Sequence, residues 1–312
     1  MSENYPEAKI IFLPFYLQCP QHRNAASARF RAEWPAKYLG ADLADEKTSE
    51  IDLLKYNIVI FQKCFNQKFV EMAKRVKKYS RARVGLDLCD PEWLIRESEI
   101  REMAEAVDFF IVPTEPMKKW FEENYPDKSA ITIWDGHDLE YYGWPNEPKN
   151  EVGPMKYVWF GNGGTIESLK AIMWLLTSVG GNKDTLTIIA DQRAQGAIFD
   201  KNIEIIFKEW ELETVNEQIK ECTLALNPRL NTPPYDFKSN NKTVTAYLLG
   251  LPCIERKVND EEGWRHDLIR FRLSENRIAD WKEKINYILE NHSMDQLVRV
   301  WQYELDKEFK KC

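Results

Sequence analysis

The sequence predicts an α/β protein of two doubly wound, Rossmann-like domains that face a cleft. Short apolar runs of strand length alternate with longer segments of helical period, as in parallel sheets covered on both faces. The alternation stops at a stretch rich in proline and glycine and then restarts. With 312 residues, 44% of them hydrophobic, the chain is long enough for two cores.

The first domain is predicted over residues 1–145, where the apolar runs are short enough for buried strands. These runs are 9–16, 57–63, 82–88, 107–113 and 130–134. Helices are expected at about 25–39, 66–79, 92–106 and 114–124. The stretch 141–156, with three prolines and two glycines, is expected to link the domains.

The second domain is predicted over residues 146–292. Its strands are expected at 156–161, 185–190, 203–207, 223–228 and 252–255, and its helices at about 166–178, 213–221 and 240–250. The end of the chain has two apolar stripes of helical period, one at 281–289 and one at 297–309. We expect residues 293–312 to form a helix that packs back on the first domain.

Charge and cysteine usage exclude some classes of protein. A net charge of −7 and a pI of about 5.4 argue against a broad basic surface for nucleic acid or anionic membranes. The six cysteines lie far apart without a CxxC pair, which favours a cytoplasmic protein with reduced thiols and no structural zinc. The N-terminus lacks the pattern of an export signal, and no apolar run approaches 18 residues.

Ligands of doubly wound sheets bind beyond the carboxyl ends of the strands, so functional residues are expected there. Gly161, Asn162, Gly163 and Gly164 follow a predicted strand and precede a helix. Backbone N–H groups of such a turn can approach an anion because the glycines lack side chains. A plain glycine-rich turn is the alternative.

The stretch KSNNK, residues 238–242, is the second candidate anion site. Ser239 is predicted to cap the following helix, with Lys238 and Lys242 on either side. Lysine is unfavourable at a helix N-terminus, so this pair indicates a phosphate or diphosphate between them. A solvated charged loop is the alternative. Further donors to the same anion are expected from Arg229, Asn240 and Asn241.

Polar residues also follow the strands of the first domain. Those expected on the acceptor side are Ser27, Arg29, Lys63 and Asp87, with Gln62 beside them. Arg29 and Arg31 are two residues apart and cannot share a helix face, so one of them is expected in solvent. Asp87 and Asp90 are candidate general bases, as are His22 and His137, although Asp90 before Pro91 also fits a helix start.

The order of several segments resembles the B-type glycosyltransferases, in particular their retaining glycogen-synthase-like branch. In the second half these segments are WFGNGG, EWELETVNEQIKECTLALNP and KSNNKTVTAYLLGLPCIE. In the first half they are NAASARFRAEWPAKYL, VDFFIVPTEPMKKWF and ITIWDGHDLEYY. The resemblance covers nearly the whole chain.

The resemblance implies transfer of a hexose or pentose from a nucleotide-diphosphate sugar, such as a UDP-sugar, to an acceptor hydroxyl. The acceptor would be a saccharide, a lipid-linked glycan or a modified DNA base. Two glutamates of the family, eight residues apart, are replaced by Phe237 and Thr245. We therefore expect Lys238, Lys242 and Arg229 to stabilise the leaving diphosphate, with no metal and no further cofactor. Trp210 is expected either to stack on the nucleotide base or to pack inside the domain.

Two other classes remain open: a nucleotide-sugar epimerase of the same architecture, and a non-catalytic nucleotide-sugar-binding protein. The basic run 71–83 has three alternative interpretations. It forms either a solvated helix face, a patch that binds a lipid surface, or a contact with nucleic acid.

Overall fold

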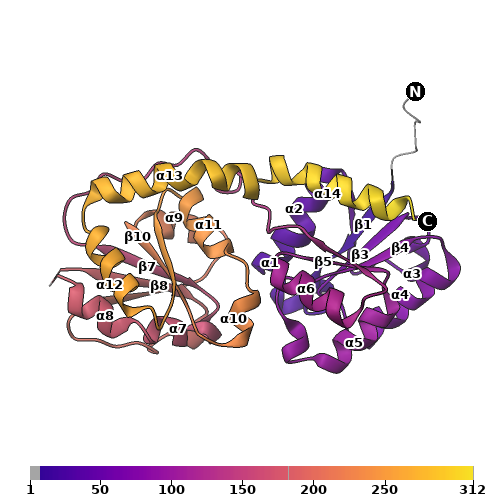
Figure 1. Ribbon diagram of the computed structural model, residues 1–312, viewed down its shortest axis with the longest axis horizontal. Helices are drawn as coiled ribbons and strands as arrows, with labels where there is room; N and C mark the ends of the chain where they lie inside the picture. Colours follow the sequence, from indigo (N-terminus) through magenta and orange to yellow (C-terminus); the bar gives the residue numbers. More distant parts are fainter. Residues whose placement is uncertain (1–7, 182, 312) are drawn as a thin grey trace. The chain divides into compact units, whose positions relative to one another are not determined.

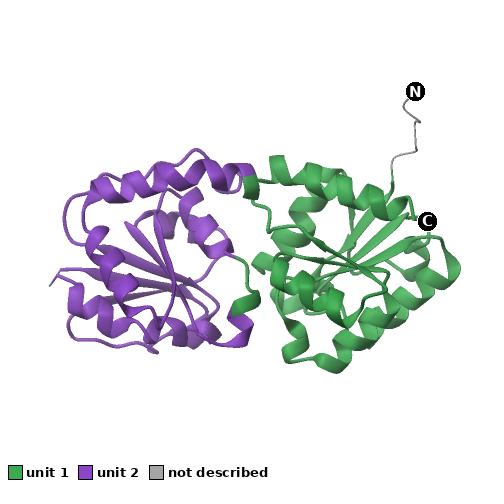
Figure 2. Cartoon of the chain, viewed as in Figure 1, with its two compact units in different colours: residues 1–138, 236–239, 291–312 green, residues 139–235, 240–290 purple. Residues whose placement is uncertain are grey.

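The computed structural model describes residues 8–181 and 183–311 (Figure 1). Residues 1–7, where an export signal would begin, and Cys312 lie outside these ranges. The chain forms two compact units (Figure 2). Unit 1 comprises Met1–Asp138, Asp236–Ser239 and Asn291–Cys312, and unit 2 comprises Leu139–Tyr235 and Asn240–Glu290. Each unit has one parallel sheet, which confirms the predicted α/β class.

The sheet of unit 1 has the strand order β2-β1-β3-β4-β5-β6. Its strands are β1 Ile10–Leu13, β2 Asp42–Leu43, β3 Ile58–Gln62, β4 Arg83–Asp87, β5 Phe109–Val112 and β6 Ser129–Thr132. Every residue of β3 and β5 is buried, because helices cover both faces of the sheet (Figure 1). The apolar runs predicted as strands therefore form the centre of the sheet.

The helices of unit 1 pack in two groups: α14 packs on α2, while α4 contacts both α3 and α5. Their bounds are α1 Ala26–Ala28, α2 Trp34–Leu39, α3 Glu50–Leu53, α4 Gln67–Tyr79, α5 Glu97–Ala106, α6 Glu115–Asn124 and α14 Met294–Phe309. A π-helical turn, Arg29–Glu33, separates α1 from α2. The helix predicted at 25–39 is thus present from Ala26 to Leu39, with a π-helical turn in its middle.

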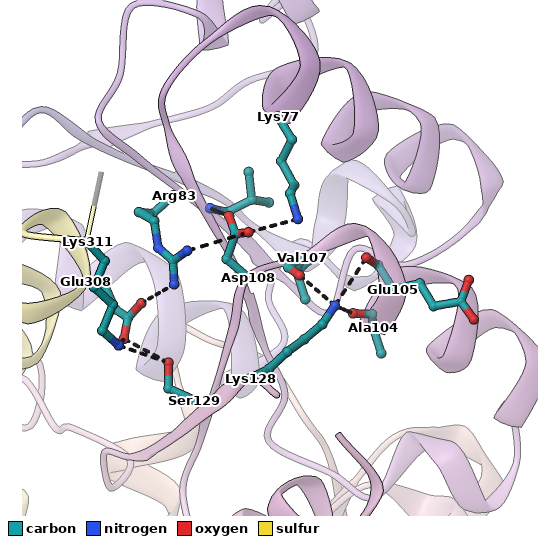
Figure 3. Close-up of polar contacts among 11 residues, drawn as sticks. Lys77, Arg83, Ala104, Glu105, Val107, Asp108, Lys128, Ser129, Glu308 and Lys311 are labelled. Carbon is teal, nitrogen blue, oxygen red and sulfur yellow. Dashed lines mark hydrogen bonds and ion pairs between the residues drawn. The ribbon is translucent and has the colours of Figure 1, made fainter. Parts of the chain in front are cut away.

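The C-terminal helix α14 is fixed to unit 1 at both ends. At its start the backbone N–H of His137 donates to the carbonyl oxygen of His292 (2.7 Å), and that of Met294 donates to the carbonyl oxygen of His137 (2.9 Å). At its end Glu308 is buried and accepts hydrogen bonds from Arg83 Nη2 (2.6 Å) and Ser129 Oγ (2.8 Å) (Figure 3).

Charged groups close the edge of the unit 1 sheet where β4 and β6 begin (Figure 3). Lys128 Nζ donates to the carbonyl oxygens of Glu105 (3.1 Å) and Val107 (2.8 Å), at the end of α5. Four cations of the basic run 71–83 are paired with acids: Lys74 with Glu71, Arg75 with Glu50, Lys77 with Asp108 and Arg83 with Glu308. Acids therefore balance most of the positive charge of this run.

The sheet of unit 2 has the order β11-β10-β7-β8-β9. Its strands are β7 Lys156–Gly161, β8 Thr185–Ala190, β9 Glu204–Glu209, β10 Leu224–Arg229 and β11 Cys253–Lys257. The helices of the second half are α7 Glu167–Lys170, α8 Met173–Val179, α9 Val215–Lys220, α10 Pro233–Phe237, α11 Asn241–Leu248, α12 Glu261–Arg270 and α13 Ser274–His292. This unit has an apolar core of its own, which includes Tyr157 and Trp159 of β7 and Leu186 and Ile188 of β8.

Each sheet reverses its strand order once. In unit 1 the reversal falls between β1 and β3, and in unit 2 it falls between β7 and β10. Ligands of doubly wound sheets bind at such a point, beyond the carboxyl ends of the strands. Lys63 directly follows β3, while Gly161 and Arg229 are the last residues of β7 and β10. The topology therefore places these three predicted residues where a ligand site is expected.

Candidate functional site

Lys242, in the first turn of α11, reaches the carboxyl end of β7. Its Nζ lies 4.9 Å from the centre of the Trp159 ring. Gly161 has a φ of +149°, and a Cβ built there would collide with Lys242 Nζ and lie 2.8 Å from its Cε. Glycine at position 161 thus makes room for an ammonium group at the point where the strand order of unit 2 reverses.

The glycine-rich turn after β7 uses its N–H groups internally. Gly164 donates to Asn162 Oδ1 (2.8 Å), and Gly163 donates to Asp191 Oδ2 (2.8 Å). The sequence predicted that these N–H groups point at an anion. The structure differs because the two side-chain oxygens already accept them.

Arg193 lies beside this turn and was missed by the sequence analysis. Its side chain is 62% exposed, yet Nε and Nη2 donate to the two oxygens of Asp191 (2.8 and 2.9 Å), and Nη2 also donates to Asn162 Oδ1 (2.9 Å). These hydrogen bonds hold the pKa of Asp191 below its usual range. The sequence could have identified Arg193 by its position, three residues after the predicted strand 185–190.

Arg229 and Trp210 are also held within unit 2. Arg229 Nη2 lies 2.5 Å from Glu255 Oε1, and the other oxygen of Glu255 accepts from Thr243 Oγ1. The charge of Arg229 is therefore balanced by a carboxylate before any anion binds. The backbone N–H of Trp210 donates to the carbonyl oxygen of Ala190 (3.0 Å), which ties Trp210 to the end of β8.

The predicted cap of α11 is wrong. The helix begins at Asn241 with Asn240 as its N-cap residue, and no side-chain hydrogen bond caps it. Ser239 belongs with Lys238 to unit 1, where its hydroxyl donates to Asp135 Oδ2 (2.5 Å). A carboxylate 104 residues away in sequence thus takes the hydroxyl that would have capped the helix.

A buried ion pair lies at the end of β4 in unit 1. Arg31 and Asp87 are fully buried, and Arg31 Nε and Nη2 donate to Asp87 Oδ1 (3.1 Å) and Oδ2 (2.7 Å). Arg31 Nη1 donates to the carbonyl oxygen of Trp134 (3.1 Å) and lies 3.7 Å from Asp135 Oδ1. The burial of Asp87 contradicts its predicted contact with an acceptor; its role is to hold Arg31.

The other two residues predicted near this edge lie in the first turns after β1. Arg29 is mostly buried, and its Nη1 donates to the carbonyl oxygen of Asn24 (2.7 Å). Ser27 is partly buried in α1. The prediction that Arg29 or Arg31 lies in solvent is wrong, because carbonyl and carboxylate oxygens within the unit bind both guanidinium groups.

Lys63 has a left-handed backbone, with a φ of 51°, which is uncommon for a residue other than glycine. Its Nζ lies 3.0 Å from Asp90 Oδ2, 2.6 Å from Glu92 Oε1 and 5.0 Å from the centre of the Phe15 ring. Burial lowers the pKa of Lys63, but nearby Cys89 and the two carboxylates raise it well above its usual value. The lysine is therefore charged.

Asp90 is a charged hydrogen-bond acceptor and a weak base. Burial raises its pKa, but Lys63 and Lys238 lower it further, to about 2. A general base works best with a pKa near the operating pH, so this value disfavours the predicted role of Asp90 in proton transfer.

The two histidines considered as bases differ in burial. His137 is fully buried against Phe30, with ring centres 4.6 Å apart, and burial holds its pKa well below the usual value. His22 is exposed and stacks on Phe15 at 5.5 Å. Of the two histidines, His22 lies nearer to Lys63, because both His22 and Lys63 contact the Phe15 ring.

Within residues 8–181 and 183–311, no group of three or more histidine, cysteine, aspartate or glutamate side chains is placed to hold a metal ion. The helices of the same ranges include none that is long and apolar enough to span a membrane.

No family profile and no curated protein matches the sequence. Solved structures do match. An α-glucosyltransferase in complex with UDP and a 13-mer DNA containing an HMU base is 8% identical, with a TM-score of 0.68 over 97% of this chain and 100% of that one. A glycosyltransferase from Rickettsia africae is 10% identical, with a TM-score of 0.63 over 98% and 100%. The fold is that of the B-type glycosyltransferases.

A third B-type structure, a mutant of S. aureus TarM in complex with Fondaparinux, α-GlcNAc-glycerol and UDP, is 13% identical with a TM-score of 0.55. That match covers 80% of this chain and 55% of TarM. The predicted resemblance to B-type glycosyltransferases is confirmed at the level of the fold.

Proposed function

We propose that the chain is a glycosyltransferase that moves a sugar from a nucleotide-diphosphate sugar, such as a UDP-sugar, to an acceptor hydroxyl. The observation that carries this proposal is the ammonium of Lys242 at the carboxyl end of β7, where the strand order of a B-type fold reverses. Unit 2 would bind the donor and unit 1 the acceptor. Two of the compared glycosyltransferases hold UDP, which supports a nucleotide-diphosphate donor.

The chemistry follows from the charge that develops during transfer. The leaving diphosphate gains negative charge, and a fixed cation or N–H donor aimed at it stabilises the transition state by roughly 3–4 kcal/mol. Lys242 would supply this from unit 2, and the reaction would need no metal. Retention is the proposed stereochemistry, because an α-glucosyltransferase keeps the configuration of an α-linked donor such as UDP-glucose.

We also propose a cytoplasmic location, in keeping with free thiols at all cysteines of the described ranges. Saccharides, lipid-linked glycans and modified DNA bases are the acceptor classes that the proposal includes. Fold alone supports each of them equally.

A turnover assay distinguishes a glycosyltransferase from an epimerase and from a non-catalytic binding protein. Purified protein is incubated with a panel of nucleotide sugars and mixed acceptors, and mass spectrometry measures nucleoside-diphosphate release and sugar products. We expect a glycosylated product with one donor, and at least about 100-fold slower turnover for Lys242→Met, since a charged hydrogen bond contributes about 1.5–3 kcal/mol and more in a transition state.

The matched control is Lys156→Met, at the other end of the same strand, where Lys156 pairs with Glu151. This variant should turn over like the native protein. Release of a free epimer without acceptor would favour an epimerase, and donor binding without any turnover would favour a binding protein. Either result contradicts the proposal.

A further inference from the structure

The charge at the end of β3 in unit 1 is layered, with the cation inside and the anions outside. The side chain of Lys63 is only 10% exposed, whereas those of Asp90 and Glu92 are 39% and 16% exposed. A ligand that reaches this edge therefore meets the Asp90 carboxylate before the Lys63 ammonium. Carboxylate groups favour hydrogen-bond donors and repel phosphates.

One oxygen of each carboxylate is left for a ligand. Lys63 binds Asp90 Oδ2 and Glu92 Oε1. Asp90 Oδ1 and Glu92 Oε2 make no hydrogen bond to any residue that the structure describes. Two charged acceptors on residues two positions apart suit a molecule that carries neighbouring hydroxyl groups.

A donor and an aromatic ring complete this edge. Gln62 Oε1 accepts from the N–H of Phe15 (2.9 Å), while Gln62 Nε2 is buried with no partner among the described residues. The centre of the Phe15 ring lies 5.0 Å from Lys63 Nζ and 5.5 Å from the centre of the His22 ring. Carboxylate acceptors and an aromatic ring are groups that bind an uncharged polyol with apolar C–H faces.

The same region lacks the surplus of positive charge that nucleic acid needs. Arg31 is matched by Asp87 and Asp135, and Lys63 by Asp90 and Glu92. Lys238 is a further cation of this edge, and its charge acts on Asp90. Ion pairs balance three cations of α4, and the whole chain has a net charge of −7. Binding to a phosphate backbone depends on lysines and arginines that displace counterions.

We propose that the acceptor is an uncharged saccharide whose hydroxyls donate to Asp90 Oδ1 and Glu92 Oε2 and whose ring packs on Phe15. This inference rests on the proposed glycosyltransferase function and names its acceptor class. It excludes DNA and anionic lipid surfaces as acceptors, although one of the compared structures binds DNA.

The test offers the donor that the native protein consumes to three acceptor sets. These are neutral oligosaccharides, a short DNA duplex with a 5-hydroxymethylated base, and vesicles of anionic phospholipid that carry a lipid-linked glycan. Transfer to an oligosaccharide is expected. Asp90→Asn and Glu92→Gln should each raise the KM for the saccharide at least about 10-fold, with the KM for the donor unchanged.

Each variant leaves one carboxylate on Lys63, so its charge keeps a partner. The matched controls are Asp127→Asn and Glu102→Gln, both at exposed positions of unit 1, and neither should change the saccharide KM. Melting temperatures of all four variants check that the fold is kept.

Three outcomes would overturn the inference. These are transfer to the DNA duplex, transfer to the vesicles, and an unchanged saccharide KM in both Asp90→Asn and Glu92→Gln. In each of them the donor is still consumed, so the proposed function stands. If the native protein consumes no donor with any acceptor, the proposed function fails and the inference fails with it.

Discussion

The carboxyl edges of the two sheets carry charge in opposite arrangements, although both sheets are parallel and reverse their strand order once. In unit 1, Lys63 lies beneath Asp90 and Glu92, so carboxylate oxygens form the outer layer. In unit 2, the ammonium of Lys242 lies over Trp159 and against Gly161. The two sheets thus share a topology, and a few local side chains give each carboxyl edge a different arrangement of charge.

The largest expected effect is on the stability of unit 1. Arg31→Met leaves Asp87 and Asp135 buried without their cation, and breaking a buried ion pair in this way costs about 3–5 kcal/mol. Urea denaturation measures the loss. The double variant Arg31→Met/Asp87→Leu should recover part of it, because the carboxylate at position 87 is gone while Asp135 still lacks its cation. A loss below about 1 kcal/mol in the single variant would show that this edge does not depend on the pair.

A smaller effect is expected on ligand binding in unit 2. Gly161→Ala places a Cβ where Lys242 Nζ lies, so the affinity for a nucleoside diphosphate should fall at least about 10-fold, or about 1.4 kcal/mol. Gly153→Ala is the matched control, because Gly153 has the same φ of +149° but nothing within 4 Å of the added Cβ. Isothermal titration should show weaker binding only for Gly161→Ala. An equal loss of affinity in both variants would show that backbone strain, and not the contact with Lys242, weakens binding.

The strands that position the site were predictable because their apolar runs are buried on both faces. β7 and β8 span the predicted ranges 156–161 and 185–190. Elements without such a pattern were missed: β2 has two exposed residues, and only Trp264 and Leu268 are buried in α12. The spacing of apolar residues does not reveal a strand or helix in which few residues are buried.

The site was less predictable because its hydrogen-bond partners lie far away in sequence. Ser239 has the residue type and position of a cap, but Asp135 takes its hydroxyl. Gly163 has the backbone of an anion-binding turn, but Asp191 accepts its N–H. Local motifs specify which groups can bind, and the tertiary fold specifies what they bind.

The diphosphate site is tested most directly by the affinity of UDP for the native protein, Lys242→Met and Lys156→Met, measured by isothermal titration calorimetry. We expect Lys242→Met to weaken binding about 10- to 100-fold, while Lys156→Met, at the opposite end of β7, should bind like the native protein. Equal affinity for all three proteins would contradict the claim that the end of β7 is the diphosphate site.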